Sequence, residues 1–313
     1  MAAAVSKDIK SSLSYLEEMR DFGGAAQCTG LGDDTIKRFL ANHPSLGIAI
    51  DRAYSHFQGL QHSHPDFVAL DEAAQVQTAH AGLTNFYAED AVNPYVAAGA
   101  AGPWVVTLKG AVVYDCGGYG MLGLGHAPPG ILDAMDQPHV MANIMTASAS
   151  QLDFIESLRA EIGHTRTSGT PYASFLCVNS GSEAMTVASR LADVNTRIHT
   201  DPGGDYEGCK LHGLSLRGSF HGRTDRPARY SHSTRKTYKK HLASYAENDY
   251  LWTVEPNDID ALEAVFAKAK EDHAFIEAFF MEPVMGEGNP GAAITPEFYA
   301  RARELTREHG TMF

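Results

Sequence analysis

Long apolar runs, paired cysteines and an excess of positive charge are what this chain of 313 residues lacks. Its four cysteines are far apart and form no Cys-x-x-Cys pair, which argues against a disulfide framework and favours reduced thiols in a cytoplasmic protein. No run of about 18 apolar residues occurs, so no membrane span is expected, and the N-terminus carries no secretory signal pattern. With 25 Lys and Arg against 38 Asp and Glu, the net charge of −13 argues against nonspecific binding to nucleic acid or anionic membranes.

The composition nevertheless leaves room for a substantial core. Hydrophobic residues make up 44% of the chain, enough for one large domain with additions or for two domains. From Ala173 onward, apolar runs alternate with helical patterns, and Ala173–Val178, Leu214–Leu216 and Ala274–Met281 are expected to be strands. This alternation predicts an α/β fold with a largely parallel sheet flanked by helices.

The N-terminal part has a different pattern. Residues 1–93 are expected to form a mainly helical extension, with helical patterns at Ile9–Met19, Asp34–Leu40 and Glu72–Tyr87. Residues 94–103 are rich in Ala and Gly and are expected to be an entry linker, after which residues 104–114 predict a hairpin.

Two helices near the C-terminal end are indicated by their end residues. Asn257 is expected to cap a helix that precedes the strand at residues 274–281. Thr295 is expected to cap the last helix, with Pro296 at its first position and Gly310 as its stop signal.

One stretch links a strand signal directly to a helix signal. Residues 179–184 have the sequence NSGSEA, in which Ser180 and Glu183 fit a capping box. A helix that begins there would have an apolar face made by four residues, Ala184, Val187, Ala188 and Leu191. Amides and hydroxyls at such a helix start can hold a phosphate, although a capped helix after a strand is more often plain scaffold.

Two further strand ends carry small and polar residues. The sequence SFHGRT occupies residues 219–224, and EPVMGEG occupies residues 282–288. In an open α/β sheet, ligands bind beyond the carboxyl ends of the strands. The three stretches are therefore expected to meet at one site.

In this order, the three stretches resemble the class III aminotransferases, which use pyridoxal 5'-phosphate (PLP). The family pattern is N-S-G-[AS]-E-A, then [FY]-H-G-R-T, then E-P-[VI]-x-G-E-G, and the resemblance covers residues 94–313. It implies fold type I of the PLP-dependent transferases, incomplete at the C-terminal end. It also implies three parts: the extension 1–93, the N-terminal part of a small domain at 94–150, and an incomplete PLP-binding large domain at 151–313.

The resemblance also implies roles for single residues. Phe220 would stack on the PLP ring, Gly181 and Ser182 would contact its phosphate, and Ser180 would either contact the cofactor or only cap the helix. The residues implied for cofactor binding are Ser180, Gly181, Ser182, Phe220, His221 and Glu282. Those implied for substrate binding are Tyr119, Arg223 and Glu287, with Glu287 pairing with an arginine later in the family sequence. Met285 stands where the family more often has glutamine, so local hydrogen bonds there are in question.

The lysine that forms the Schiff base with PLP, and the aspartate that pairs with the pyridine nitrogen, are expected beyond Phe313. The implied function of the intact parent is transamination between an amine or ω-amino acid and a 2-oxo acid, in a homodimer. This chain alone is expected to be inactive. Two alternatives stay open: a PLP-dependent decarboxylase or aminomutase of the same fold, and a non-catalytic fragment or interaction unit.

Two other clusters are interpreted without a function. His56, His62 and His64 have no metal-binding spacing and are expected in a loop, so no metal is expected. A basic stretch runs from Arg217 to Lys240 with two tyrosines in it. Because the chain is acidic overall, this stretch is expected to be a solvated loop near an anionic site rather than a nucleic-acid surface.

Overall fold

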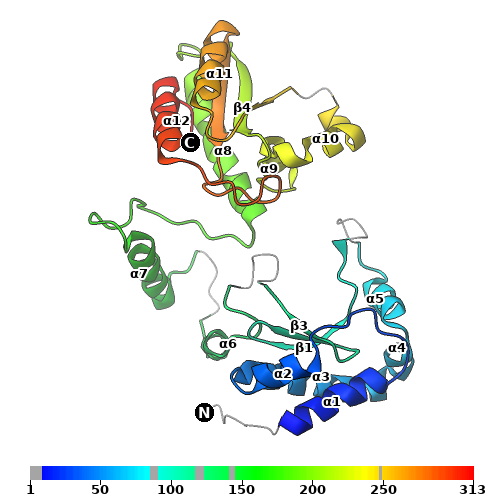
Figure 1. Ribbon diagram of the computed structural model, residues 1–313. Coiled ribbons are helices and arrows are strands. Elements are labelled where there is room, and N and C mark those ends of the chain that lie inside the picture. The colour runs from blue at the N-terminus through cyan, green and yellow to red at the C-terminus, as the bar shows by residue number, and fades with distance from the viewer. Residues whose placement is uncertain (1–8, 85–90, 117–122, 141–144, 247–248) are drawn as a thin grey trace. The chain divides into compact units, whose positions relative to one another are not determined.

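The computed structural model describes residues 9–84, 91–116, 123–140, 145–246 and 249–313 (Figure 1). The chain divides into two compact units, Met1–Ser148 and Ala149–Phe313. Each unit has its own three-stranded sheet and its own hydrophobic core. None of the helices in these ranges is both long and apolar enough to cross a membrane.

The first unit is a bundle of helices packed on an antiparallel sheet (Figure 1). The sheet has the order β1-β2-β3, with Val105 opposite Val113 in the β2–β3 pair. Helix α3 lies so close to β1 that a Cβ on Gly99 would meet the backbone nitrogen of Ala53 at 2.3 Å. The elements are α1 (Ile9–Asp21), α2 (Asp33–Leu40), α3 (Pro44–Ser63), α4 (Pro65–Ala69), α5 (Glu72–His80), β1 (Ala97–Ala101), β2 (Trp104–Thr107), β3 (Val112–Tyr114) and α6 (Pro129–Met135).

Two expectations for this unit were wrong. The stretch expected as a linker contains strand β1, whose small residues permit the close approach of α3. His56 and His62 lie inside α3 rather than in a loop. The signal for α3 was present in the sequence, because its buried residues follow helical spacing: Leu46, Ala49, Ile50, Ala53 and Phe57.

The hairpin turn was confirmed, but the lysine in it is not exposed. Lys109 is only 2% exposed. Its Nζ donates to the carbonyl oxygens of Val68 at 3.2 Å and Phe22 at 3.4 Å. Burial lowers the pKa of Lys109, and nearby Asp71 and Glu72 oppose that shift. The side chain thus ties the hairpin to the ends of α1 and α4.

The second unit is built on a parallel sheet of order β5-β4-β6. Beyond the outer edge of β6, Met312 forms a parallel bridge with Ala278, so the run at residues 311–313 adds to the sheet. The elements are α7 (Ala149–Gly163), α8 (Gly181–Thr200), β4 (Lys210–Leu216), α9 (Asp225–Tyr230), α10 (His232–His241), a 3-10 turn (Ala243–Tyr245), β5 (Leu251–Val254), α11 (Ile259–Glu271), β6 (Ala274–Phe280) and α12 (Pro296–His309).

A polar cluster is buried beside this sheet. The hydroxyls of Tyr230 and Tyr250 both donate to Glu277 on β6, and the two hydroxyl oxygens are 2.6 Å apart. Burial is the main cause that raises the pKa values of both tyrosines. The charge of Glu277 raises the pKa of Tyr230 further, and Tyr230 and Glu277 do the same for Tyr250. Gly213 on β4 makes room for the rings, since a Cβ there would lie 2.6 Å from Tyr230.

The predicted strand at residues 173–178 is not formed. The segment has no regular structure and is largely exposed, with Leu176 65% exposed. The predicted apolar face of the following helix was also wrong. α8 buries Ser189, Ala192 and Thr196 instead, and leaves Leu191 59% exposed.

Several helix ends were predicted to within a residue or two. Thr295 caps α12, Pro296 is its first residue, and Gly310 ends it with a φ of 75°. The predicted cap at Asn257 was wrong by one position, because Asp258 caps α11 through its bond to the Ala261 amide. The helix expected over 72–87 ends at His80, and residues 85–90 lie outside the described ranges. The basic stretch expected as a loop forms α9 and α10.

Candidate functional site

The start of α8 is a capped helix end with spare donors. The Ser180 Oγ accepts the Glu183 amide at 3.2 Å, and the Glu183 carboxylate accepts the Asn179 amide at 2.7 Å. The carboxylate thus reaches one residue farther back than in the usual capping box. Within the described part of the chain, the amides of Gly181 and Ser182 have no hydrogen-bond partner.

Gly181 has an ordinary backbone conformation. Its φ is not in the left-handed region, and a Cβ added to it would meet nothing within 4 Å. The backbone conformation at this position therefore does not require glycine. A side chain at this position would instead fill the open space in front of the helix end.

The loop after β4 lies against this helix end. Gly222 has a φ of 124°, and a Cβ there would lie 2.6 Å from the Ser182 Oγ. Ser231 holds the loop from behind, because its Oγ accepts the His221 amide at 2.8 Å and lies 3.1 Å from the Gly222 carbonyl oxygen. The first two sequence motifs are therefore in contact although 40 residues separate Ser182 from Gly222.

Glu282 joins the second motif to the third. One carboxylate oxygen accepts the Phe220 amide at 3.1 Å, and the other accepts the Gly286 amide at 3.0 Å. Charged acceptors make the stronger class of hydrogen bond. Glu282 thereby fixes the loop that carries Phe220 relative to the loop after β6.

The same two loops also meet without side chains. A Cβ on Gly288 would lie 2.0 Å from the carbonyl oxygen of Gly218, so only glycine fits at position 288. Met285 is 2% exposed, and its amide donates to the Ala292 carbonyl at 2.9 Å. Its sulfur lies 3.8 Å from the Asn289 amide nitrogen, so methionine still supplies an acceptor there.

Arg223 and Glu287 form an ion pair at 3.2 Å, with side chains 31% and 35% exposed. The guanidinium carbon also lies 5.2 Å from the centre of the Phe220 ring, within the range of a cation–π contact. Glu287 thus has an arginine partner inside this chain. Sequence reasoning assigned both residues to substrate but missed their pairing, because 64 residues separate them.

His221 is buried and uncharged at neutral pH. It is 8% exposed, and burial lowers its pKa to about 4 against the opposing effect of a backbone hydrogen bond with Phe280. Its ring lies 6.0 Å from the Phe280 ring, measured between centroids. Nε2 is buried and has no hydrogen-bond partner in the described ranges.

One residue of the predicted site, Tyr119, belongs to the first unit. Tyr119 lies outside the described residues. Near it in sequence, Asp115 and His126 are 2.8 Å apart between Oδ2 and Nε2, a contact that sequence reasoning missed. Ser231 was missed as well, since a serine at a helix cap carries no distinguishing signal.

The residues at the start of α8 fit the phosphate of PLP. Two unbonded amides and the Ser182 hydroxyl lie at the positive end of a 20-residue helix. The Gly222 backbone lies so close to Ser182 that a Cβ at position 222 would crowd the Ser182 hydroxyl. Phe220, half-buried on the adjoining loop, offers a flat apolar face.

Comparisons with known proteins agree with this arrangement at the level of the fold. Ornithine aminotransferase from Toxoplasma gondii has a TM-score of 0.60 and 20% identity, covering 80% of this chain and 54% of its own. Lysine aminotransferase from M. tuberculosis has a TM-score of 0.56 and 22% identity, covering 76% and 57%. An aminotransferase from Vibrio fluvialis has a TM-score of 0.54 and 19% identity, covering 76% and 54%.

The chain therefore spans a little over half the length of these structures. The family model described as Aminotransferase class-III matches residues 86–313, which is most of the chain. This protein belongs to the class III aminotransferase family.

Proposed function

We propose that this chain holds PLP with its phosphate at the start of α8 and its ring against Phe220, and that the whole protein is a transaminase. The contact between Ser182 and Gly222 carries the proposal, since it joins a phosphate-type helix end to the loop bearing the aromatic residue. When bound, PLP serves as the electron sink through which an amino group is transferred.

The other residues of the site hold this geometry. Glu282 fixes the Phe220 amide, and Ser231 fixes the His221 amide, so the aromatic face is set by charge-assisted and buried hydrogen bonds. His221 stays neutral because it is buried. It therefore adds no positive charge that would compete with the helix end for the phosphate.

Arg223 is proposed to bind the carboxylate of the substrate. Its pairing with Glu287 supports this role, because a planar guanidinium that already donates to one carboxylate can exchange it for another. Glu287 would then act as the internal competitor that holds Arg223 in place when no substrate is bound. The expected substrates are amino acids and 2-oxo acids that carry a carboxylate at that end.

Cofactor binding is tested with pyridoxamine 5'-phosphate, which has no aldehyde to react with surface lysines. Calorimetric titration of the chain should show weaker binding, roughly tenfold, after Ser182→Ala, because a hydrogen bond to a charged phosphate is lost. Phe220→Ala should weaken it by about 1–3 kcal/mol if base stacking is a fair guide. Ser174→Ala, on the exposed segment before α8, is the matched control and should change nothing.

The substrate role is tested by steady-state kinetics of the whole protein. Arg223→Ala should leave cofactor content unchanged and raise the apparent KM for the carboxylate substrate. Glu287→Gln should lower that KM, because it removes the internal competitor. If Ser182→Ala and Phe220→Ala retain the cofactor while Arg223→Ala loses it, the cofactor and substrate sides are reversed.

A further inference from the structure

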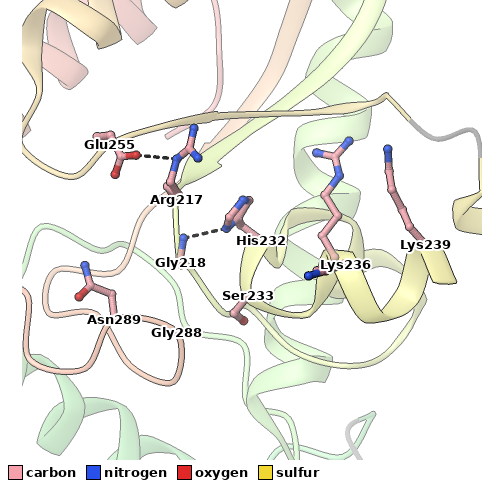
Figure 2. A pocket seen from close by; sticks show the side chains of 10 residues that line it. Arg217, Gly218, His232, Ser233, Lys236, Lys239, Glu255, Gly288 and Asn289 are labelled. Carbon is pink, nitrogen blue, oxygen red and sulfur yellow. Dashed lines mark hydrogen bonds and ion pairs between the residues drawn. The ribbon is translucent and has the colours of Figure 1, made fainter. Parts of the chain in front are cut away.

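A cavity separate from the proposed cofactor site lies at the carboxyl ends of β4 and β5, lined in part by the loop after β4 and by α10. Its volume is about 760 Å³, within the range of small-molecule sites. Arg217 and Gly218 line it from the end of β4, His232 to Lys239 from α10, and Gly288 and Asn289 from the loop after β6 (Figure 2). None of the lining residues belongs to α8, and neither Phe220 nor Arg223 is among them.

The cavity concentrates positive charge on an acidic protein. Arg217, Arg235, Lys236 and Lys239 line it against a single lining carboxylate, Glu255, although the chain as a whole carries −13. The pair between Arg217 and Glu255 is at 2.6 Å, with both side chains more than half exposed, so solvent weakens it. Lys239 approaches Asp249 only to 3.6 Å, and that carboxylate is 92% exposed.

Arginines elsewhere in the basic stretch are also paired with carboxylates, as Arg217 and Lys239 are in the cavity. Three other arginines of the stretch are each paired with a carboxylate: Arg223 with Glu287, Arg226 with Asp193 and Arg229 with Asp225. Tyr230, one of its two tyrosines, is 2% exposed and bonded to Glu277. A continuous surface of cations and aromatic rings, as nucleic acid requires, is therefore not formed.

The walls of the cavity are held in place. The Gly218 amide donates to His232 Nδ1 at 2.9 Å, and the Ser233 amide donates to the Ser219 carbonyl at 3.0 Å. Burial, then Arg217 and Arg235, lowers the pKa of His232, which leaves a neutral ring with its proton on Nε2. Ser233 contributes a buried hydroxyl with no partner among the described residues.

We propose that this cavity binds a small molecule that carries two or more phosphoryl groups. A ligand with one carboxylate group would balance only one of these positive charges and would leave the other lining cations to repel one another. A diphosphate or triphosphate supplies several charges and enough acceptor oxygens for the arginine forks and the lysine ammonium groups. The start of α10 at the same cavity adds the positive end of a 10-residue helix.

Calorimetry with inorganic orthophosphate, pyrophosphate and tripolyphosphate tests the proposal on the chain as it stands. Affinity should rise with the number of phosphoryl groups and fall between 50 and 200 mM salt, as charge attraction requires. The double variant Lys236→Gln, Lys239→Gln removes two exposed cations of α10 and should weaken tripolyphosphate binding by roughly tenfold or more.

The control has the same change in net charge. Arg190→Gln with Lys270→Gln alters two exposed cations on α8 and α11 and should leave affinity within about twofold, with circular dichroism confirming the fold of both doubles. Ser182→Ala should leave tripolyphosphate binding unchanged, which separates this site from the proposed cofactor site. Equal weakening in both doubles, no dependence on phosphoryl number, or no binding at all would overturn the proposal. Displacement of tripolyphosphate by a short single-stranded RNA of higher affinity would assign the cavity to nucleic acid instead.

Discussion

Two apolar segments that were both expected to be strands differ in structure. Residues 173–178 are exposed and irregular, whereas β6, at residues 274–280, buries Phe275 and Ile276 completely. β6 is hydrogen-bonded to β4 on one side and receives Met312 on the other, while residues 173–178 pair with no strand in the described ranges. A strand sequence permits a strand, but neighbouring backbone decides whether it forms.

The largest predicted effect separates these two runs. Phe279→Ala on β6 should lower the free energy of unfolding by about 3–5 kcal/mol, because a side chain only 1% exposed leaves a cavity. Leu176→Ala should change it by less than about 0.5 kcal/mol, since the side chain is mostly in solvent. Urea unfolding of both variants measures the difference. A large loss from Leu176→Ala would mean that the segment is packed after all.

The next largest effect is expected from acid, which should lower the stability of the region around β6, where the His221 ring lies near Phe280. The pKa of His221 in the folded protein is about 4, below its ordinary value near 6.5, so the unfolded chain binds more protons between these two values. The stabilising contribution of the neutral ring is complete above pH 6.5 and is lost as the pH falls toward 4. Stability should drop by about 2 kcal/mol from this group between pH 7.5 and pH 5.

Urea titrations of wild type and His221→Gln at the two pH values isolate that contribution. The variant should show a shallower pH dependence than wild type by the same amount. His164→Gln, an exposed position just before the irregular segment, should keep the wild-type slope. An unchanged slope in His221→Gln would show that the ring is protonated or exposed in the folded protein.

The third prediction compares two glutamates that accept loop amides. Glu282→Gln removes a charged acceptor from the Phe220 and Gly286 amides and should cost about 1–2 kcal/mol. Glu183→Gln loses one bond to the Asn179 amide at an exposed site and should cost about 0.5 kcal/mol. Thermal unfolding of the pair gives the ranking. Equal costs would mean that Glu282 does not join the two loops.

The smallest effect is expected on the outer face of α8. Leu191, Val194 and Ile198 are 59%, 58% and 69% exposed, at helical spacing. Replacement of each with Gln should change stability by less than about 0.5 kcal/mol, with Ala192→Gln as a buried comparison that should be strongly destabilising. A loss above about 1 kcal/mol at the exposed positions would show that they are covered in solution.

The predictions that depend only on neighbouring residues were correct at three helix ends. The cap at Ser180, the Pro296 start and the Gly310 stop are set by neighbouring residues, and the structure confirms all three. Residues 173–178 and the buried face of α8 depend on partners distant in the chain, which periodicity alone does not identify. The contacts within the candidate site likewise depend on residues distant in the chain.

The motifs predicted that three loops come together, but not how they are joined. Glu282 on the Phe220 amide and Arg223 on Glu287 are contacts across more than 60 residues. Helix α3 is a different case, because its buried residues follow helical spacing in the sequence although its histidines were expected in a loop.

The side-chain contacts of Asn257 have a consequence for local unfolding. Its side chain accepts the Thr295 amide at 2.9 Å and donates to the Ala293 carbonyl at 3.0 Å, which closes a loop of 38 residues around α11 and β6. The entropic cost of closing such a loop grows only slowly with its length, so two hydrogen bonds can help to hold the whole segment in place. The segment from Asn257 to the start of α12 should therefore open as one cooperative unit in native-state hydrogen exchange, with α11, β6 and the start of α12 exchanging together.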